Sequence, residues 1–215
     1  MPIWIKICAT TSLGDALASV AAGADALGFI FAPSPRRITP EQAREIATQL
    51  PEKIERIGVF VNESPELIRA TVEQVGLTAV QLHGEETPEF LAGLFARGGR
   101  GRRIGLIKSI LANDQFETRL ALFTRNRECV DSILIDSGSG SGKTFDWDKV
   151  QSLVRGHTMR FIIAGGLNPE NVGVAVQKFS PWGVDVVSGV EREPGRKDPE
   201  KLQAFIAAVR KAEQQ

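Results

Sequence analysis

One short pattern recurs along this chain: a capping side chain, then proline, then glutamate. Its five copies are Thr39-Pro40-Glu41, Ser64-Pro65-Glu66, Thr87-Pro88-Glu89, Asn168-Pro169-Glu170 and Asp198-Pro199-Glu200. A Ser, Thr, Asn or Asp side chain caps the free N–H groups of a helix, proline suits the first helical position, and an acid suits the positive first turn. Each copy follows an apolar, strand-like run. The pattern therefore predicts five helix starts, each preceded by a strand.

The longest gap between copies has room for further units of the same kind. It predicts helix starts near Asn113, Asp146 and Asn168, and a first helix from about Ser12 brings the number of units to eight. Apolar runs place the matching strands at Ile3–Cys8, Ala26–Phe31, Arg56–Val61, Ala79–Leu82, Ile104–Lys108, Ser132–Asp136, Arg160–Ala164 and Val184–Val187. Strict alternation of strand and helix predicts a parallel sheet, because the crossover connections are right-handed.

Eight units in 215 residues predict a single-domain (β/α)8 TIM barrel spanning residues 1–215. Roughly 27 residues per unit is short but sufficient for this fold. The alternative is an open, doubly wound sheet. The chain has no GxGxxG after the first strand and no pattern of a second domain, so the barrel is favoured. The active site of such a barrel lies at the carboxyl ends of its strands.

Charge and composition argue against several classes of partner. Lys and Arg number 26, as do Asp and Glu, and the densest cationic patch, GRGRR at 99–103, is interpreted as a solvated loop. Nucleic acid and membrane surfaces are therefore poor candidates. No apolar run approaches the roughly 18 residues of a membrane span, and MPIWIKIC lacks the features of a signal peptide. Cys8 and Cys129 form no metal-type spacing. We expect a cytoplasmic, cofactor-independent protein without a metal, as a monomer or homodimer.

The carboxyl ends of the expected strands carry most of the candidate chemistry. They hold, in chain order, Cys8, Phe31, Asn62, His83, Lys108, Asp136, Gly165-Gly166 and Ser188-Gly189. Because side chains alternate along a strand, the expected inward residues of strands one, four and six are Trp4, Lys6 and Cys8, then Gln81 and His83, then Leu134 and Asp136. A thiol and a carboxylate should therefore face each other across one cavity.

Each of these residues also has a purely structural interpretation. A cysteine at a strand end is often a small buried hydrophobe, an aspartate often caps a loop, and a lone histidine is often a packed imidazole. The loop SGSGSGKT at 137–144 misses the phosphate-loop pattern GxxxxGK[ST] because Ser137 stands where glycine is needed; a flexible lid fits better. The stronger phosphate candidates are Gly165-Gly166 and Ser188-Gly189, since loops 7 and 8 of such barrels bind phosphate through backbone N–H groups.

Taken together, these segments resemble the phosphoribosylanthranilate isomerase family of tryptophan biosynthesis. The similarity covers nearly the whole chain: KIC at 6–8, GADALGFIFAPSPRRI at 23–38, GVFVN at 58–62, QLHGEE at 81–86, GSGKTFDW ending at 147, AGGLNPENV at 164–172 and VDVVSGVE at 184–191. The resemblance implies a (β/α)8 barrel and a cofactor-free Amadori rearrangement of N-(5-phosphoribosyl)anthranilate, a small-molecule substrate. It also implies roles for single residues: Cys8 as general base, Asp136 as general acid, Arg36 on the anthranilate, Gln81, His83 and Asp185 lining the site, and Gly165, Gly166, Ser188 and Gly189 on the phosphate.

The residue types suit that chemistry. Opening an aminofuranose ring needs a proton at the ring oxygen, which a carboxylic acid supplies, and the resulting Schiff base loses its C2′ proton to a base. A thiolate can be that base if a positive environment lowers its pKa, and Lys6 is a distant candidate for this. The chain departs from the family pattern at Ala9, where glycine is usual, at Val187, where serine is common, and by one residue fewer before Ser34.

Two other classes of function remain as alternatives: a related phosphate-binding barrel enzyme and a non-catalytic ligand-binding barrel. An indole-glycerol-phosphate synthase would use a lysine acid–base set and a histidine-pathway isomerase paired aspartates, and a first strand ending in Cys8 argues against both. A non-catalytic ligand-binding barrel would be expected to have lost Cys8 or Asp136, and the chain has both.

Overall fold

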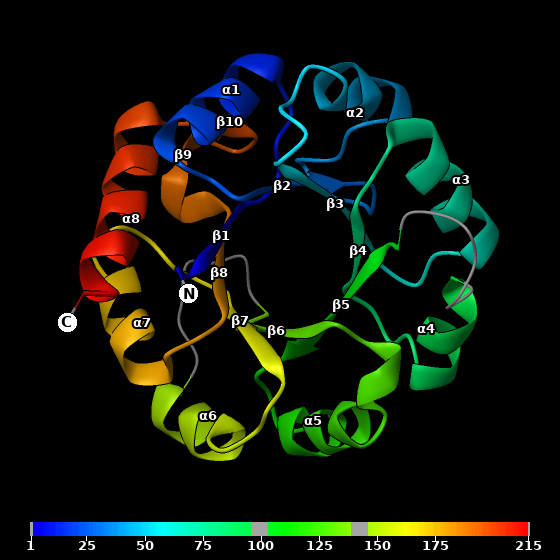
Figure 1. Cartoon of the computed structure of the whole chain (residues 1–215), viewed down its shortest axis with the longest axis vertical. Coiled ribbons are helices and arrows are strands. Elements are labelled where there is room, and N and C mark those ends of the chain that lie inside the picture. Colours follow the sequence, from blue (N-terminus) through cyan, green and yellow to red (C-terminus); the bar gives the residue numbers. More distant parts are fainter. Residues whose placement is uncertain (1, 96–102, 139–145, 215) are drawn as a thin grey trace.

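The eight predicted strands close into a barrel in the computed structural model, which describes residues 2–95, 103–138 and 146–214. Neighbouring strands are parallel and follow one another in chain order, so the last strand pairs with the first (Figure 1). The strands are β1 Trp4–Ile7, β2 Ala26–Ile30, β3 Glu55–Phe60, β4 Ala79–Leu82, β5 Gly105–Leu111, β6 Ser132–Asp136, β7 Arg160–Ile163 and β8 Gly183–Val186. The predicted (β/α)8 barrel is confirmed.

A helix follows each strand and covers the outside of the barrel (Figure 1). The helices are α1 Leu13–Ala22, α2 Pro40–Ala47, α3 Pro65–Val75, α4 Pro88–Leu94, α5 Phe116–Arg125, α6 Trp147–Val154, α7 Val172–Phe179 and α8 Pro199–Ala212. Four copies of the recurrent pattern begin a helix at their proline, with the preceding Thr39, Ser64, Thr87 or Asp198 accepting backbone N–H bonds. Ser12 and Asp146 also cap helices, as predicted. Within the described ranges, no helix is long and apolar enough to cross a membrane.

Two helices begin later than predicted, and both predicted starts fall on asparagine. The fifth copy of the pattern forms a turn, and α7 begins only at Val172. The Asn168 side chain accepts the N–H groups of Glu170 and Asn171 at 3.0 and 2.9 Å. Asn113 similarly accepts the N–H of Gln115, and α5 begins at Phe116. Such asparagine turns satisfy backbone donors locally and so delay the helix.

Two further elements differ from the prediction. The fifth strand continues to Leu111, so Lys108 lies within the strand rather than at its end. A short hairpin, β9 Glu191–Glu193 with β10 Arg196–Lys197, is inserted between β8 and α8. It is preceded by a 3₁₀ turn over Ser188–Val190, and a second such turn, Arg127–Cys129, precedes β6. Figure 1 places the hairpin between α1 and α8, where Thr11 donates to the Gly195 carbonyl.

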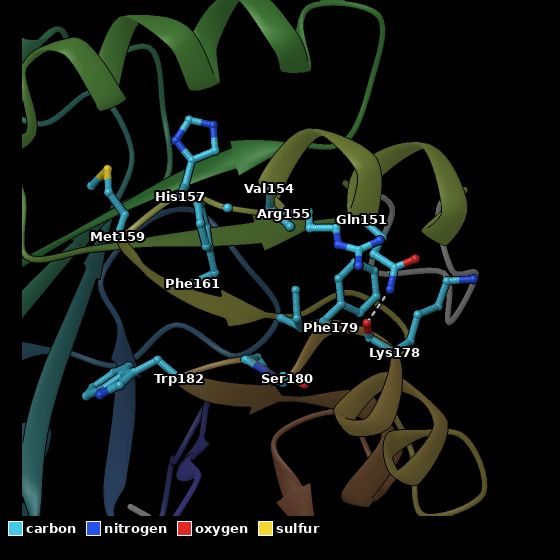
Figure 2. Close-up of a pocket in the computed structure, with 13 residues that line it drawn as sticks. Gln151, Val154, Arg155, His157, Met159, Phe161, Lys178, Phe179, Ser180 and Trp182 are labelled. Atoms are coloured by element: carbon cyan, nitrogen blue, oxygen red, sulfur yellow. Dashed lines mark hydrogen bonds between the residues drawn. The ribbon is translucent and has the colours of Figure 1, made fainter.

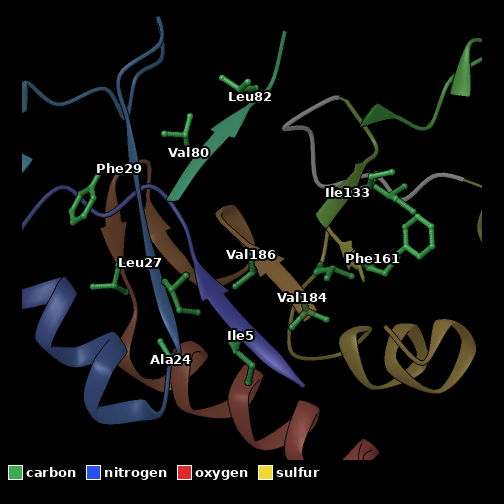
Figure 3. Close-up of a cluster of buried hydrophobic side chains, with 14 of the residues drawn as sticks. Ile5, Ala24, Leu27, Phe29, Val80, Leu82, Ile133, Phe161, Val184 and Val186 are labelled. Carbon is green, nitrogen blue, oxygen red and sulfur yellow. The ribbon is translucent and has the colours of Figure 1, made fainter. Parts of the chain in front are cut away.

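The strands bury both of their faces. One apolar cluster fills the layer between strands and helices and includes Ile5, Leu27, Val80, Ile133 and Val184 (Figure 3). A second cluster fills the barrel interior, and its members are Trp4, Ala26, Ile57, Ala79, Ile107, Leu134, Ile162 and Ala164. The alternation of side chains therefore placed Trp4 and Leu134 inward correctly. Trp182 stacks on Trp4 at the amino end of the barrel, with 5.0 Å between ring centroids.

Candidate active site

Five polar side chains cross the barrel above its apolar filling. The Lys6 ammonium on β1 donates to Asp185 Oδ1 on β8 at 2.9 Å and to Gln81 Oε1 on β4 at 2.8 Å. The Gln81 Nε2 atom lies 3.2 Å from Nδ1 of His83, just beyond the end of β4. His83 Nε2 lies 3.4 Å from Oδ2 of Asp136, the last residue of β6. The structure thus brings together four of the residues that the resemblance implicates, and Lys6 joins them.

Burial and charge act in opposite directions within this network. Burial alone would lower the pKa of Lys6, but Asp185 and Cys8 outweigh it and raise that pKa above the ordinary value. For His83 the balance is reversed: burial lowers its pKa, and Asp136 opposes this without overcoming it. At neutral pH the network therefore holds a charged Lys6 and an uncharged His83.

Cys8 lies directly after β1 and is only 3% exposed. Room for it comes from Gly28 on β2, since a Cβ at that position would lie 2.5 Å from the Cys8 Sγ and 3.0 Å from the Lys6 Cε. Burial raises the pKa of the Cys8 thiol, and the charges of Lys6 and Lys197 oppose the rise without reversing it. Lys6 thus acts in the expected direction and lies closer than expected, but in the free protein Cys8 is a protonated thiol at neutral pH.

The backbone after Cys8 has the conformation that glycine usually provides. Ala9 has a φ of 61°, in the left-handed region, which costs a residue with a Cβ roughly 1–2 kcal/mol. The neighbouring backbone is anchored on both sides: the Cys8 N–H donates to the Val186 carbonyl at 2.9 Å, and the Lys197 ammonium donates to the Cys8 carbonyl at 2.6 Å. The replacement of glycine by Ala9 therefore leaves the candidate base in place at the expense of local strain.

Arg36 is held by a carboxylate that the sequence did not single out. Its Nε and Nη2 atoms donate to Glu191 on β9 at 3.0 and 2.7 Å, and Lys197 on β10 lies 3.3 Å from the same carboxylate. Burial would raise the pKa of Glu191, but the bonds from Arg36 and the Lys197 charge lower it, so Glu191 is ionised. Arg37 is exposed. Glu191 and Lys197 belong to the hairpin that was not predicted, although Glu191 closes the segment VDVVSGVE.

A buried ion pair fixes the loop that carries His83. Lys108 donates to Glu86 at 2.7 Å and to the carbonyls of Leu82 and Gly84 at 3.0 and 2.7 Å. Glu86 in turn accepts the N–H groups of Asn62 and Gly84. Lys108 is fully buried, and its three donors are used by this loop. Its contribution to the site is therefore to position the end of β4.

The two glycine loops lie against their neighbours at the carboxyl ends of β6, β7 and β8. Gly165 has a φ of 79°, and a Cβ there would lie 2.3 Å from the Ser137 nitrogen. A Cβ on Gly189 would lie 2.0 Å from the Leu167 carbonyl oxygen. Gly166 also has a positive φ of 70°. The short turn expected after Ser188 is present, whereas the helix expected near Asn168 begins later, at Val172.

The glycine-rich loop after β6 is described only at its start. Gly138 has a φ of 82°, and its N–H donates to the Asp136 Oδ1 at 2.9 Å, so the beginning of the loop orients the candidate acid. The predicted lid over residues 137–144 lies for the most part outside the described residues, and so does most of the cationic patch at 99–103.

A separate cavity of about 440 Å³ lies between α6, α7 and the amino end of β7. Figure 2 shows its polar side chains, which include Arg155, His157 and Lys178, with Gln151 bonded to the Lys178 carbonyl. His157 is exposed and packs edge-on against Phe161. This cavity is on the outside of the barrel and shares no residue with the polar network, so it is not the site of the predicted chemistry.

A closed (β/α)8 barrel with a thiol, a carboxylate and an imidazole at the carboxyl ends of its strands defines an acid–base enzyme of the TIM-barrel class. Comparison with known protein families then identifies the family within this class. The family model described as N-(5′-phosphoribosyl)anthranilate (PRA) isomerase matches residues 5–208, and the chain belongs to this family.

Individual relatives match over nearly the full length. The N-(5′-phosphoribosyl)anthranilate isomerase of Pelobacter propionicus is 45% identical over 210 residues, which cover 95% of this chain and 94% of the relative. The crystal structure of the Thermotoga maritima phosphoribosyl anthranilate isomerase has a TM-score of 0.86 at 42% identity and covers 97% of this chain and 99% of its own. A phosphoribosyl anthranilate isomerase in complex with reduced 1-(o-carboxyphenylamino)-1-deoxyribulose 5-phosphate has a TM-score of 0.81 at 41% identity, with the same coverage.

Proposed function

We propose that this protein is a phosphoribosylanthranilate isomerase. It converts N-(5-phosphoribosyl)anthranilate into 1-(2-carboxyphenylamino)-1-deoxyribulose 5-phosphate in tryptophan biosynthesis, without a cofactor. Family membership supports the reaction, and a relative bound to a reduced form of that product supports the substrate class. The observation that carries the proposal is the polar network itself, which links the Cys8 end of β1 to Asp136 at the end of β6.

The first half of the reaction needs an acid. Asp136 donates a proton to the ring oxygen of the substrate while the bond from that oxygen to C1′ breaks, which leaves a Schiff base and an Asp136 carboxylate. The Gly138 N–H already contacts one oxygen of Asp136, and His83 lies beside the other. These neighbours hold the carboxyl group in one orientation as its charge develops.

The second half needs a base. The Cys8 thiolate removes the C2′ proton of the Schiff base, which gives an enolamine, and the enolamine becomes the ketone when the proton of its C2′ hydroxyl moves to C1′. One proton is delivered and one is removed, so the overall change is an isomerisation. Lys6 and Lys197 favour the thiolate by their charge, although burial of Cys8 works against it.

The remaining residues bind the two ends of the substrate. Arg36 takes the anthranilate carboxylate, exchanging its partner Glu191 for a ligand of the same charge and geometry. Gly165, Gly166, Ser188 and Gly189 take the phosphate, because loops 7 and 8 present backbone N–H groups at the same end of the barrel. Gln81, His83 and Asp185 lie between these ends, where the ribosyl moiety reacts.

The proposal is tested by following the fluorescence of freshly generated N-(5-phosphoribosyl)anthranilate. We expect purified protein to accelerate its decay well beyond the spontaneous rate, and Cys8→Ala protein with an unchanged circular dichroism spectrum to lose the acceleration. If the wild-type protein does not accelerate the decay, the proposed reaction is wrong. If Cys8→Ala retains full activity, the reaction stands but its base lies elsewhere.

A further inference from the structure

Gln81 lies in the site without facing Asp136 or Cys8 directly, and its contacts point to a role in ordering protons. Given the proposed isomerase function, we propose that Gln81, oriented by Lys6, holds His83 in the uncharged tautomer that carries its proton on Nε2. Gln81 is then a positioning residue. It makes His83 a fixed N–H donor beside Asp136 and prevents it from becoming a second acid.

The orientation of the Gln81 amide follows from its first neighbour. The Lys6 ammonium has three donors and no acceptor, so the Gln81 atom 2.8 Å away must be the amide oxygen. A flipped amide would place an NH2 group against an ammonium with both groups buried, which leaves two donors facing each other. Asp185, 2.9 Å from the same ammonium, keeps Lys6 charged and therefore keeps this constraint in force.

The tautomer of His83 follows from the second neighbour. With its oxygen on Lys6, Gln81 presents its NH2 group to His83 Nδ1 at 3.2 Å, and Nδ1 must accept. An uncharged imidazole that accepts at Nδ1 carries its proton on Nε2, the atom 3.4 Å from Asp136 Oδ2. That distance is longer than an ordinary N–H···O bond, as is common for catalytic contacts before substrate binds. An imidazolium would place an N–H at Nδ1 against the Gln81 NH2 group, so this arrangement disfavours it.

Charges around His83 act in both directions. Asp136 on β6 and Asp185 on β8 favour the imidazolium, whereas Lys6 on β1 and Lys108 on β5 oppose it, and burial, the largest effect, also lowers the pKa of His83. The geometry at Gln81 therefore acts in the same direction as burial. Asp136 accepts N–H groups from two sides, Gly138 at one oxygen and His83 at the other, when it gives up its proton.

The chain contains only two histidines, so ¹⁵N NMR can observe each ring separately. We expect one ring, assigned to His83 by its loss in His83→Gln, to show an unprotonated Nδ1 and a protonated Nε2 from neutral pH down to well below the usual histidine pKa. The exposed His157 supplies the second ring in the same sample, and its signals persist in His83→Gln. A charged His83 at neutral pH, or a proton on its Nδ1, would overturn the proposal.

The matched variants are Gln81→Glu and Gln81→Met. A glutamate accepts from Lys6 as the amide oxygen does, but its second oxygen also accepts a hydrogen bond from a protonated His83 Nδ1, so the pKa of His83 should rise by about 1–3 units. In Gln81→Met the tautomer is no longer imposed, and Nδ1-protonated ring should become detectable. An unchanged titration and tautomer in both variants would contradict the role of Gln81. If either variant fails to fold, the wild-type tautomer and its persistence at low pH still decide the question.

Kinetics separate positioning from mere support of the fold. In Gln81→Met, kcat should fall by about 10- to 100-fold while KM changes much less, because the uncharged His83 ring can then carry its proton on Nδ1 and no longer donates to Asp136, while the binding groups remain. His83→Gln, which keeps an N–H donor, should retain more activity than His83→Leu. Equal losses of activity in His83→Gln and His83→Leu would show that His83 does not act as an N–H donor to Asp136. The NMR result does not depend on turnover, so failure of the isomerase assay and failure of this proposal are distinguishable.

Discussion

The two halves of the barrel interior are built on the same strands and have opposite character. Towards the amino ends, Trp4, Ala79 and Leu134 pack in a dry apolar layer. Two residues further along the same strands, about 7 Å away, stand Lys6, Gln81 and Asp136. Burial of apolar side chains in the lower half stabilises the fold. Burial of polar and charged side chains in the upper half costs free energy of hydration, which only the contacts among these side chains offset.

This difference teaches which changes affect stability and which affect catalysis. Truncation in the lower half removes packing and creates a cavity. Truncation in the upper half removes a hydrogen-bond or charge partner at the proposed reaction site. Each of these strands contributes one inward residue to the lower layer and the next inward residue to the upper layer. Substitutions at two such residues of the same strand therefore make the sharpest comparison.

The largest expected effect is on turnover in the upper half. Cys8→Ala and Asp136→Asn should each lower kcat by about 10²–10⁴-fold, the usual contribution of a general acid or base, with little change in thermal stability. Steady-state kinetics and thermal denaturation of the same preparations provide the measurement. A rate above about a tenth of the wild-type value in either variant would remove the role assigned to that residue.

The matching change in the lower half is Leu134→Ala, two residues before Asp136 on β6. Leu134 is fully buried, so the free energy of unfolding should fall by about 2–5 kcal/mol. Urea denaturation measures this loss. Because Leu134 makes no part of the polar network, kcat at a temperature where the variant is folded should stay close to that of the wild type. A loss of kcat comparable to that of Asp136→Asn would show that the two halves are not separable.

Binding at the rim should be affected less than chemistry. Arg36→Met should lower kcat/KM by roughly 10-fold or more, since a hydrogen bond to a charged group contributes about 1.5–3 kcal/mol. Arg37→Met is the control, because Arg37 is exposed while Arg36 turns towards Glu191. If Arg37→Met proves the more damaging change, the shorter loop before Ser34 has shifted the contact and the assignment of Arg36 is wrong.

The pH dependence follows from burial of the thiol. Burial raises the pKa of Cys8, so at neutral pH only a small fraction of the free enzyme holds a thiolate. If the thiolate is the base, kcat/KM should increase about tenfold per pH unit up to that pKa. The rising limb of the pH profile should therefore extend above the ordinary thiol pKa of about 8.5. Lys197→Met removes a cation that favours the thiolate and should move the limb to higher pH. A limb that stays in place would show that Lys197 only anchors the Cys8 carbonyl.

The smallest expected effect concerns the strained residue beside the base. Ala9→Gly relieves roughly 1–2 kcal/mol of left-handed strain and adds about 0.4–1 kcal/mol of unfolded-state entropy. The net gain should lie between zero and about 1.6 kcal/mol, seen as a rise in Tm of up to several degrees. Because the φ of 61° is already suited to glycine, kcat should not change. A lower Tm in Ala9→Gly would mean that the Ala9 methyl group contributes packing that exceeds the strain.

Much of the fold could be predicted because its signals are local. Cap, proline and acid stand next to one another, and inward and outward residues alternate along each strand. The prediction failed at Asn168 because its side chain satisfies two backbone donors without starting a helix. It also failed for the hairpin after β8, whose strands of three and two residues are too short for any alternation to be detected.

The candidate site could be predicted only in part, for a related reason. Strand ends placed Cys8, His83 and Asp136 on one rim, but the partners of these groups come from distant positions in the chain. Glu191 meets Arg36 across 155 residues, and no local pattern marks such a pair. The protonation state of Cys8 could not be predicted from the sequence either, because it depends on how far burial of the thiol outweighs the charges of the neighbouring lysines.

The bond between Lys6 and Asp185 joins the first strand to the last, 179 residues apart. In a chain whose strands pair in order, that junction closes the ring and brings together the two barrel strands most distant in sequence. An unclosed intermediate would separate the ammonium from its carboxylate, and without that pairing nothing would fix the orientation of the Gln81 amide. For this protein, the proposed arrangement of protons for the reaction therefore depends on a completed circle of strands.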